Sequence, residues 1–214
     1  MSRVLPILFN AEMVRAILEG RKSCTRKIVK SQQFIGMLPD KCKNGAPEKF
    51  LKEKKLMFKP YCDMTDIELI NTAYKAPYQP GDILYVRETW KKAPNGYYYY
   101  EDWQRNDIAD VTKWKPSIHM PKEAARIWLR VTDVRVERLQ EITVDGCHRE
   151  GINIETSAVT DGETLNRKHD FSLEKFETLW DSTVKKSDID RYGWDANPWV
   201  WVIEFERCEK PEGV

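Results

Sequence analysis

The sequence lacks several features that would place it quickly in a functional class. It contains no run of the roughly 20 apolar residues that a membrane helix needs. Its first apolar stretch, residues 4–9, is too short for a signal peptide. Charge of one sign is not in excess either, because 35 Lys and Arg offset 34 Asp and Glu to give a formal net charge of +1. These absences argue against membrane insertion, secretion and binding of polyanions through bulk charge.

The cysteines do not have the spacing of metal ligands. The number of cysteines is odd and no pair has the usual spacing of a structural zinc site, so neither a disulfide framework nor a metal centre is indicated. The five cysteines are Cys24, Cys42, Cys62, Cys147 and Cys208. We therefore expect a protein of the reducing cytoplasm that uses no metal and no other cofactor. Its oligomeric state cannot be predicted from these features.

What the sequence does contain is a series of short strand patterns separated by a few helices. Alternating apolar residues predict strands at 4–9, 83–89, 126–138 and 199–205, and a hairpin at Asn95-Gly96. The third strand is long, so we expect a bend near Thr132-Asp133. Helical spacing predicts helices between Asn10 and Gly20, at 142–150 and at 172–184.

These patterns predict the α+β class, because strands dominate and no βαβ alternation is present. The expected architecture is a mixed β-barrel decorated by about three helices, with long loop insertions. We expect one domain over residues 1–214. A lysine-rich segment without periodicity indicates one insertion at 31–78, and a second is expected at about 91–120.

A basic segment after the first helix places an amine near a hydroxyl. The hydroxyl of Thr25 becomes a nucleophile only when a base takes its proton, and Lys22 can be that base only as a neutral amine. Residues i and i+3 lie on opposite faces of a strand but on one side of a turn, so a joint role requires a turn directly after Gly20. The other interpretation is a solvated basic loop. Three further cations in this segment favour the neutral amine: Arg21, Arg26 and Lys27.

Glu150, at the end of the second predicted helix, is the candidate third member of this group. A carboxylate near Lys22 would orient the amine, move a proton to a leaving group or activate water. The alternative is an acid at a helix end that faces solvent. Arg21 and Arg26 are also candidates for substrate binding, as are five residues outside the basic segment: Arg87, Glu88, Trp90, His119 and Trp199. For the aromatic residues, ordinary core packing is the competing interpretation.

Gly20-Arg21-Lys22 with Thr25 resembles the GxKxxT signature of the ASCH family, a branch of the PUA-like superfamily. Other blocks follow in the family's order, at 81–86, 149–151 and 200–205. The chain is similar above all to the longer ASCH proteins of tailed bacteriophages and prophages, through stretches that include 86–90, 116–121 and 194–199. The resemblance implies a PUA-like barrel, and the host cytoplasm as location if the chain is encoded by a phage.

Small bacterial ASCH proteins hydrolyse N4-acetylcytidine, and their triad falls on Lys22, Thr25 and Glu150. The resemblance implies an amidohydrolase, working without a metal, in which Thr25 is the nucleophile, Lys22 its base and Glu150 the proton shuttle. The small enzymes are shorter, and Cys24 stands where they usually have an apolar residue, so its thiol is a competing nucleophile. Other ASCH relatives bind or cut RNA. A non-catalytic protein that binds RNA or a modified base, and a ribonuclease, are therefore the alternatives, and the expected ligand is a nucleoside or RNA.

Overall fold

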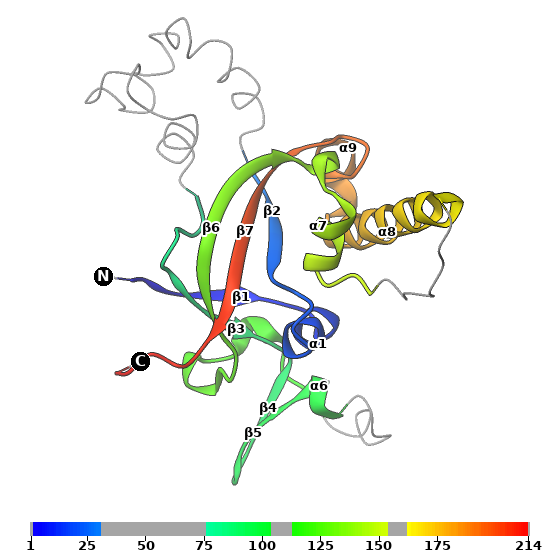
Figure 1. Ribbon diagram of the computed structural model, residues 1–214. Helices are drawn as coiled ribbons and strands as arrows, with labels where there is room; N and C mark the ends of the chain where they lie inside the picture. The colour runs from blue at the N-terminus through cyan, green and yellow to red at the C-terminus, as the bar shows by residue number, and fades with distance from the viewer. Residues whose placement is uncertain (1, 31–75, 104–112, 154–161, 214) are drawn as a thin grey trace, which may run out of the picture.

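The computed structural model describes residues 2–30, 76–103, 113–153 and 162–213, without the side chains of 162–170 (Figure 1). The insertion predicted at 31–78 falls almost entirely outside the described residues, as do Cys42, Cys62 and residues 104–112 of the second predicted insertion. Both insertions, and the single domain over 1–214, stay predictions.

A five-stranded sheet in the order β1-β3-β6-β7-β2 forms the centre of the described structure. Strand β1 is parallel to β3, and the other neighbours are antiparallel. The long strands β6 and β7 run side by side and curve together (Figure 1). The strands are β1 (Val4–Leu8), β2 (Cys24–Ile28), β3 (Ile83–Arg87), β6 (Trp128–Arg138) and β7 (Trp199–Cys208). The α+β class is confirmed, whereas closure into a barrel stays a prediction because β1 and β2 are edge strands among the described residues.

The three predicted helices are present, and the described ranges contain two more short ones. The helices are α1 (Ala11–Leu18), α6 (Tyr100–Trp103), α7 (Val144–Arg149), α8 (Gly162–Thr183) and α9 (Ile189–Tyr192). Helix α8 begins earlier than predicted, at Gly162 rather than Ser172. The predicted hairpin is formed by β4 (Trp90–Ala93) and β5 (Gly96–Tyr99), although Tyr100 begins α6 instead of extending the strand. In Figure 1 the hairpin extends away from the sheet.

Local signals explain how the chain reaches the candidate site from α1. The side chain of Asn10 accepts a hydrogen bond from the Met13 amide at 2.8 Å, which caps the first turn of the helix. Val14 and Ile17 bury one side of α1. Gly20 then adopts a φ of +76°, a conformation that glycine reaches without steric cost, and the helix ends there as predicted. The chain continues into β2 after a short connection, residues 21–23.

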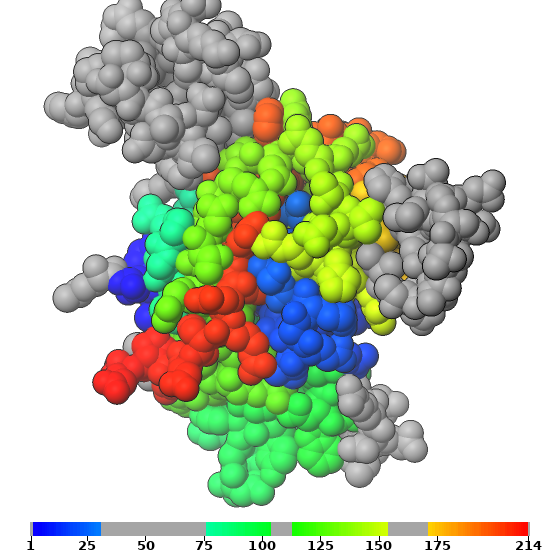
Figure 2. Space-filling model, in the orientation of Figure 1, coloured from blue at the N-terminus to red at the C-terminus, as the bar shows by residue number. Residues whose placement is uncertain are grey.

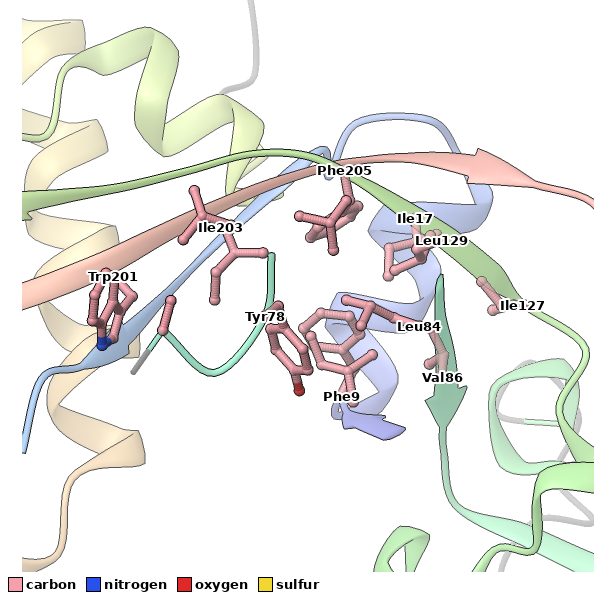
Figure 3. Packing of buried hydrophobic residues seen from close by; sticks show 14 of the residues in the cluster. Phe9, Ile17, Tyr78, Leu84, Val86, Ile127, Leu129, Trp201, Ile203 and Phe205 are labelled. Carbon is pink, nitrogen blue, oxygen red and sulfur yellow. The ribbon is translucent and has the colours of Figure 1, made fainter. Parts of the chain in front are cut away.

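The sheet has two covered faces, which we call inner and outer. Trp201, Ile203 and Phe205 of β7 point to the inner face, where they pack with α1, β1 and β3 (Figure 3). Val200 and Val202 point to the outer face and pack with α7 and α8. This alternation places the residues of β2 as well, because directly paired residues of antiparallel strands point to the same side.

The expected bend in β6 is confirmed by a bulge. The register between β6 and β7 shifts between Val131 and Asp133, so Thr132 is the extra residue. After the bulge, Val134 lies opposite Ile203, again on the inner face. The bulge bends β6 and at the same time keeps its apolar residues directed to the inner side.

Candidate active site

Lys22 lies in the connection between α1 and β2, and its amine is completely enclosed. The side chain has an exposed fraction of 0%. Its Nζ donates to the carbonyl oxygen of Cys24 at 2.8 Å, to the carbonyl oxygen of Glu150 at 2.8 Å and to Oε2 of Glu150 at 2.7 Å. All three partners are acceptors, and an ammonium group has three hydrogens to donate. Lys22 is therefore held as the charged ammonium.

Glu150 reaches Lys22 because α7 ends against α1. Thr143 caps the start of α7 by accepting from the Gly146 amide at 3.0 Å, and Glu150 is the last residue before Gly151. Gly151 has a φ of +99°, and a Cβ atom there would lie 2.7 Å from the Cβ of Ala16. This close approach needs a glycine. Figure 2 shows the N-terminal segment in direct contact with the segment that contains α7.

Arg26 holds the other oxygen of the Glu150 carboxylate. Its Nη1 donates to Oε1 of Glu150 at 3.1 Å, and its Nη2 lies 3.3 Å from Oε2 of Glu137 on β6. The guanidinium carbon is 5.9 Å from the centre of the Phe176 ring on α8. Glu150 is thus a buried carboxylate between two buried cations, Lys22 and Arg26, which largely compensate the cost of burying its charge.

The network of charges continues to the surface along β6 and β7. Arg135 pairs with both Glu137 and Glu204, and Arg149 pairs with Glu204 at 2.6 Å. The hydrogen bond from Arg149 lowers the pKa of Glu204. Alternating charges therefore link the buried carboxylate of Glu150 with partly exposed residues of β6 and β7, and none of these partners beyond Arg26 was predicted.

Thr25 lies on the other side of β2 from Arg26. It pairs with Ile203, so its side chain points to the inner face, and its exposed fraction is 6%. Residues 21–23 form a short connection without regular structure, and Thr25 already belongs to β2, so the turn that a joint role of Lys22 and Thr25 would require does not extend to Thr25. A solvated loop is also excluded for Lys22, which is buried. Within the described ranges, the Thr25 hydroxyl has no hydrogen-bond partner.

Cys24 points to the outer face and is not poised as a nucleophile. It is 2% exposed, and burial raises the pKa of its thiol to about 12. The thiolate is the nucleophilic form of cysteine, so it is scarce here at neutral pH. This argues against the competing role that the sequence suggested for Cys24.

A cavity of about 710 Å³ lies between α1, the chain after α7, and α8. Glu150 and Arg21 are among its lining residues, whereas Lys22 and Thr25 are not. Arg21 donates to the carbonyl oxygen of Gly151 and to Oε2 of Glu19. Glu150 therefore lies between the enclosed amine of Lys22 and this cavity.

Three predicted ligand contacts near the end of β3 have structural partners of their own. Arg87 donates to the carbonyl oxygen of Met120 at 2.7 Å. Glu88 is 2% exposed and forms two hydrogen bonds of 2.9 Å with Arg126, and burial raises its pKa against the opposing effect of Arg126. Trp90 is buried against Met120. No contact described in the structure joins them to Lys22 or Glu150.

His119 and Trp199 are also separate from the Lys22–Glu150 pair. His119 is exposed in a short 3-10 turn at 117–119. Trp199 begins β7, with the guanidinium of Arg138 4.3 Å from its ring centre. The structure thus brings together Lys22, Arg26 and Glu150, with Arg21 at the adjoining cavity. Ligand roles for these seven predicted contacts stay predictions: Arg21, Arg26, Arg87, Glu88, Trp90, His119 and Trp199.

Lys27 and Tyr78 are polar residues of the inner face that were not among the predicted site residues. Lys27 pairs with Trp201 and points to the same side as Thr25. Its Nζ donates to the hydroxyl of Tyr78 at 3.2 Å, and that hydroxyl donates to the carbonyl oxygen of Pro6 at 2.8 Å. Burial lowers the pKa of Lys27 and raises the pKa of Tyr78 to about 12. The period-two alternation of a strand was the signal that could have paired Lys27 with Thr25.

The described residues contain no group of three or more His, Cys, Asp or Glu side chains arranged to hold a metal ion. Within those ranges, no helix combines the length and the apolar character needed to cross a bilayer.

Comparison with known proteins gives one weak structural similarity. No family model matches the sequence, and no curated protein matches it either. The structure is similar to the crystal structure of an ASCH domain from Lactobacillus crispatus JV V101, with a TM-score of 0.36 and 10% sequence identity over 96% of this chain and 79% of that chain. A similarity of this size carries no argument about the site. Membership of the ASCH family therefore stays a prediction from the sequence motifs.

Proposed function

We propose that this protein is an amidohydrolase that removes an acyl group from an N-acylated cytosine nucleoside of the N4-acetylcytidine type, without a metal. The observation that carries the proposal is the buried contact of 2.7 Å between Lys22 Nζ and Glu150 Oε2, beside the strand that bears Thr25. An amine, a carboxylate and a hydroxyl are the groups that acyl transfer through a covalent intermediate uses, and Thr25 follows Lys22 by three residues in the chain.

The proposed reaction has two halves: acyl transfer to Thr25, and hydrolysis of the acyl-threonine ester. The Oγ1 atom of Thr25 loses its proton and bonds to the acyl carbon, and the bond from that carbon to the exocyclic nitrogen of cytosine breaks. The leaving nitrogen takes a proton and departs as the amine of cytidine. Water then attacks the acyl-threonine ester, releasing the carboxylic acid and restoring the hydroxyl.

The role of Lys22 as base requires a prior proton transfer, because Lys22 is held as an ammonium. The proton can pass from Nζ to Oε2 of Glu150 over 2.7 Å, which leaves a neutral amine and a carboxylic acid. That acid could then protonate the leaving nitrogen, as predicted for Glu150. The contact from Arg26 to Oε1 opposes the transfer, because a cation favours the charged carboxylate.

A protein that binds RNA or a modified base without catalysis is the second candidate. The observation that favours it is the saturation of the Lys22 amine by three acceptors. Lys22 and Arg26 are buried, so contacts with phosphate would come from cations at the cavity, such as Arg21. Loss of such a cation should weaken binding and reduce its salt dependence.

The test incubates the purified protein in EDTA with N4-acetylcytidine and, separately, with single-stranded RNA. We expect equal amounts of acetate and cytidine from wild type, a reduced rate from Thr25→Ser, and none from Thr25→Ala or Lys22→Ala. Circular dichroism and thermal unfolding of each variant check the fold. Acetate release by Thr25→Ala at the wild-type rate would exclude the assignment. RNA fragments would support the ribonuclease, and binding without any product would support the second candidate.

A further inference from the structure

The aromatic residues of the β4–β5 hairpin are divided between its two sides. Trp90, Tyr97 and Tyr99 point to one side, because Trp90 pairs with Tyr99 and residues 97 and 99 are two positions apart in β5. These rings pack with Met120 and Ala124. The hydroxyl of Tyr99 also donates to the carbonyl oxygen of Ala124 at 2.7 Å. Ordinary packing therefore accounts for the rings on this side of the hairpin.

The other side of the hairpin carries Tyr98, which pairs directly with Lys91. The rings of Tyr98 and Trp103 meet edge to face, with 5.9 Å between their centres. All three side chains are partly exposed, and the described residues place none of them in a buried hydrophobic cluster. Core packing therefore does not account for this second pair of rings.

A second pair of partly exposed rings lies on the same side. Lys115 forms a bridge with Trp90, so Trp114, the preceding residue of an extended segment, points to the side of Tyr98. The rings of Trp114 and Tyr100 meet edge to face at 5.4 Å. We call this side the aromatic face, which consists of five partly exposed residues: Lys91, Tyr98, Tyr100, Trp103 and Trp114.

The charge around the aromatic face is positive. Residues 90–100 and 113–116 contain four lysines and no Asp or Glu, in a chain with a net charge of +1. The two acids that follow in α6, Glu101 and Asp102, form ion pairs with arginines. No carboxylate of the described residues pairs with the four lysines, so their charge is complementary to that of a polyanion.

We infer that the aromatic face binds single-stranded RNA. The bases of a single strand stack on partly exposed aromatic rings with little dependence on sequence, and lysines beside the rings neutralise phosphates. This inference goes beyond the proposed function, because binding at the hairpin does not need Thr25. The choice of RNA over DNA rests on the proposed function, whose substrate is a ribonucleoside.

The aromatic face is anchored to the candidate active site through α6. Nε of Arg15 on α1 donates to Oε1 of the buried Glu101 on α6 at 2.5 Å, and the two helices lie next to each other in Figure 1. Arg15 also lines the cavity that adjoins Glu150. An RNA strand on the hairpin would therefore be held beside the helix that borders this cavity, as a substrate nucleoside embedded in RNA requires.

The test measures the binding of a fluorescein-labelled oligouridylate of about 12 nucleotides by fluorescence anisotropy. This probe contains no cytosine, so its binding is independent of the proposed reaction. We expect Tyr98→Ala to raise Kd by about 10-fold and Tyr98→Phe to leave it unchanged, because phenylalanine keeps the ring on which a base stacks.

The lysines are tested through the salt dependence of binding. Lys91→Gln and Lys113→Gln should each reduce the slope of log Kd against log salt concentration by about 0.7, the value for one phosphate contact with a single strand. The matched control is Lys186→Gln. Lys186 is exposed just before α9, which lies at the opposite end of the molecule from the hairpin (Figure 1), so this substitution should leave the slope unchanged.

The inference and the proposed function fail in different ways. Equal Kd values for Tyr98→Ala and wild type, or an RNA duplex bound as tightly as the single strand, would overturn stacking on the aromatic face. Tighter binding of the matching DNA strand would overturn the choice of RNA. Binding of oligouridylate without acetate release from N4-acetylcytidine would support this inference and exclude the proposed function, and acetate release without binding would do the reverse. If circular dichroism shows that Tyr98→Ala is unfolded, the salt slopes of the lysine variants decide.

Discussion

The amine of Lys22 and the carboxylate of Glu150 lie 2.7 Å apart although 128 positions separate the two residues in the sequence. Their side chains are 0% and 5% exposed. The contact fastens the end of α7 to the start of β2, and Arg26 extends it across the outer face. A buried ion pair of this kind fixes an arrangement more than it adds stability, because removing two charges from water costs about as much as their attraction returns.

Removal of one member should therefore destabilise the protein strongly. We expect Glu150→Gln to lower the free energy of unfolding by about 3–5 kcal/mol, because it leaves the buried cations Lys22 and Arg26 without their shared carboxylate. Urea unfolding measures the effect. The matched control is Glu206→Gln. Glu206 is 58% exposed and makes a long, solvent-exposed ion pair of 3.8 Å with Arg130, so this substitution should lower the free energy of unfolding by at most about 1 kcal/mol. Equal effects of the two substitutions would contradict the structural role of Glu150.

Gly151→Ala should destabilise the protein more than Gly81→Ala. Both glycines have φ near +90°, a conformation that is unfavourable for alanine, so each substitution should lower the free energy of unfolding by about 1–3 kcal/mol. A Cβ at Gly151 would also lie 2.7 Å from that of Ala16 and 3.3 Å from that of Lys22, whereas a Cβ at Gly81 meets nothing within 4 Å. The difference between the two variants in thermal unfolding isolates the close approach of α7 to α1. Identical losses would show that this contact is not tight.

Cys24 should resist alkylation in the folded protein. Burial raises the pKa of its thiol to about 12 and also blocks access, so iodoacetamide at pH 8 should leave it unmodified. Cys208, which is only partly buried, is the internal control and should react faster. Peptide mass spectrometry measures the fraction of Cys24 and of Cys208 that is alkylated, before and after unfolding in urea. Rapid labelling of native Cys24 would restore it as a candidate nucleophile.

Asp82 should make the protein less stable as the pH falls below about 4. Burial raises the pKa of Asp82, but the hydrogen bonds from Arg3 and from the Gln79 amide outweigh this effect and lower it below the usual value of 3.8. The unfolded chain then binds more protons than the folded one between the two pKa values. The stabilisation is complete above the unfolded pKa and disappears as pH falls through the folded pKa.

The measurement for Asp82 is the free energy of unfolding between pH 2.5 and pH 7. Asp82→Asn removes the titrating group, so its stability should fall less steeply in the acidic range than that of wild type. Arg3→Gln should flatten the same part of the curve, because it removes the partner that lowers the pKa. A wild-type slope in both variants would show that other carboxylates determine the acid response.

Much of the fold was predictable because its signals are local. The cap at Asn10, the helix end at Gly20 and the bulge next to Asp133 follow from the preferences of a few adjacent residues. The start of α8 was missed because residues 162–171 lack a clear apolar stripe. Barrel closure depends on how distant strands pair, which no single segment encodes.

The candidate site was predictable only as a set of residues. The GxKxxT motif identified Lys22 and Thr25, but it did not show that they lie in different local structures. Arg26 was expected to bind substrate, and its contact with Glu137, 111 positions away, was not foreseen. Contacts of this kind depend on the register of β2, β6 and β7, which is set by the whole sheet. The position of Lys27 next to Thr25 required only that the start of β2 be known.

Because of the bulge in β6, the bend of this strand can change without a change in which side chains point inward. Thr132 and Asp133 together oppose Glu204, so a chain without Thr132 would form a regular ladder in which Val134 still lies opposite Ile203. The strand would straighten while Glu137 kept its place beside Arg26. Deletion of Arg130, by contrast, would reverse the orientation of every earlier residue in the strand. Among one-residue deletions in this strand, only the loss of one of the two bulge residues, Thr132 or Asp133, thus leaves every inward-pointing residue in place, and the strand then loses its bend.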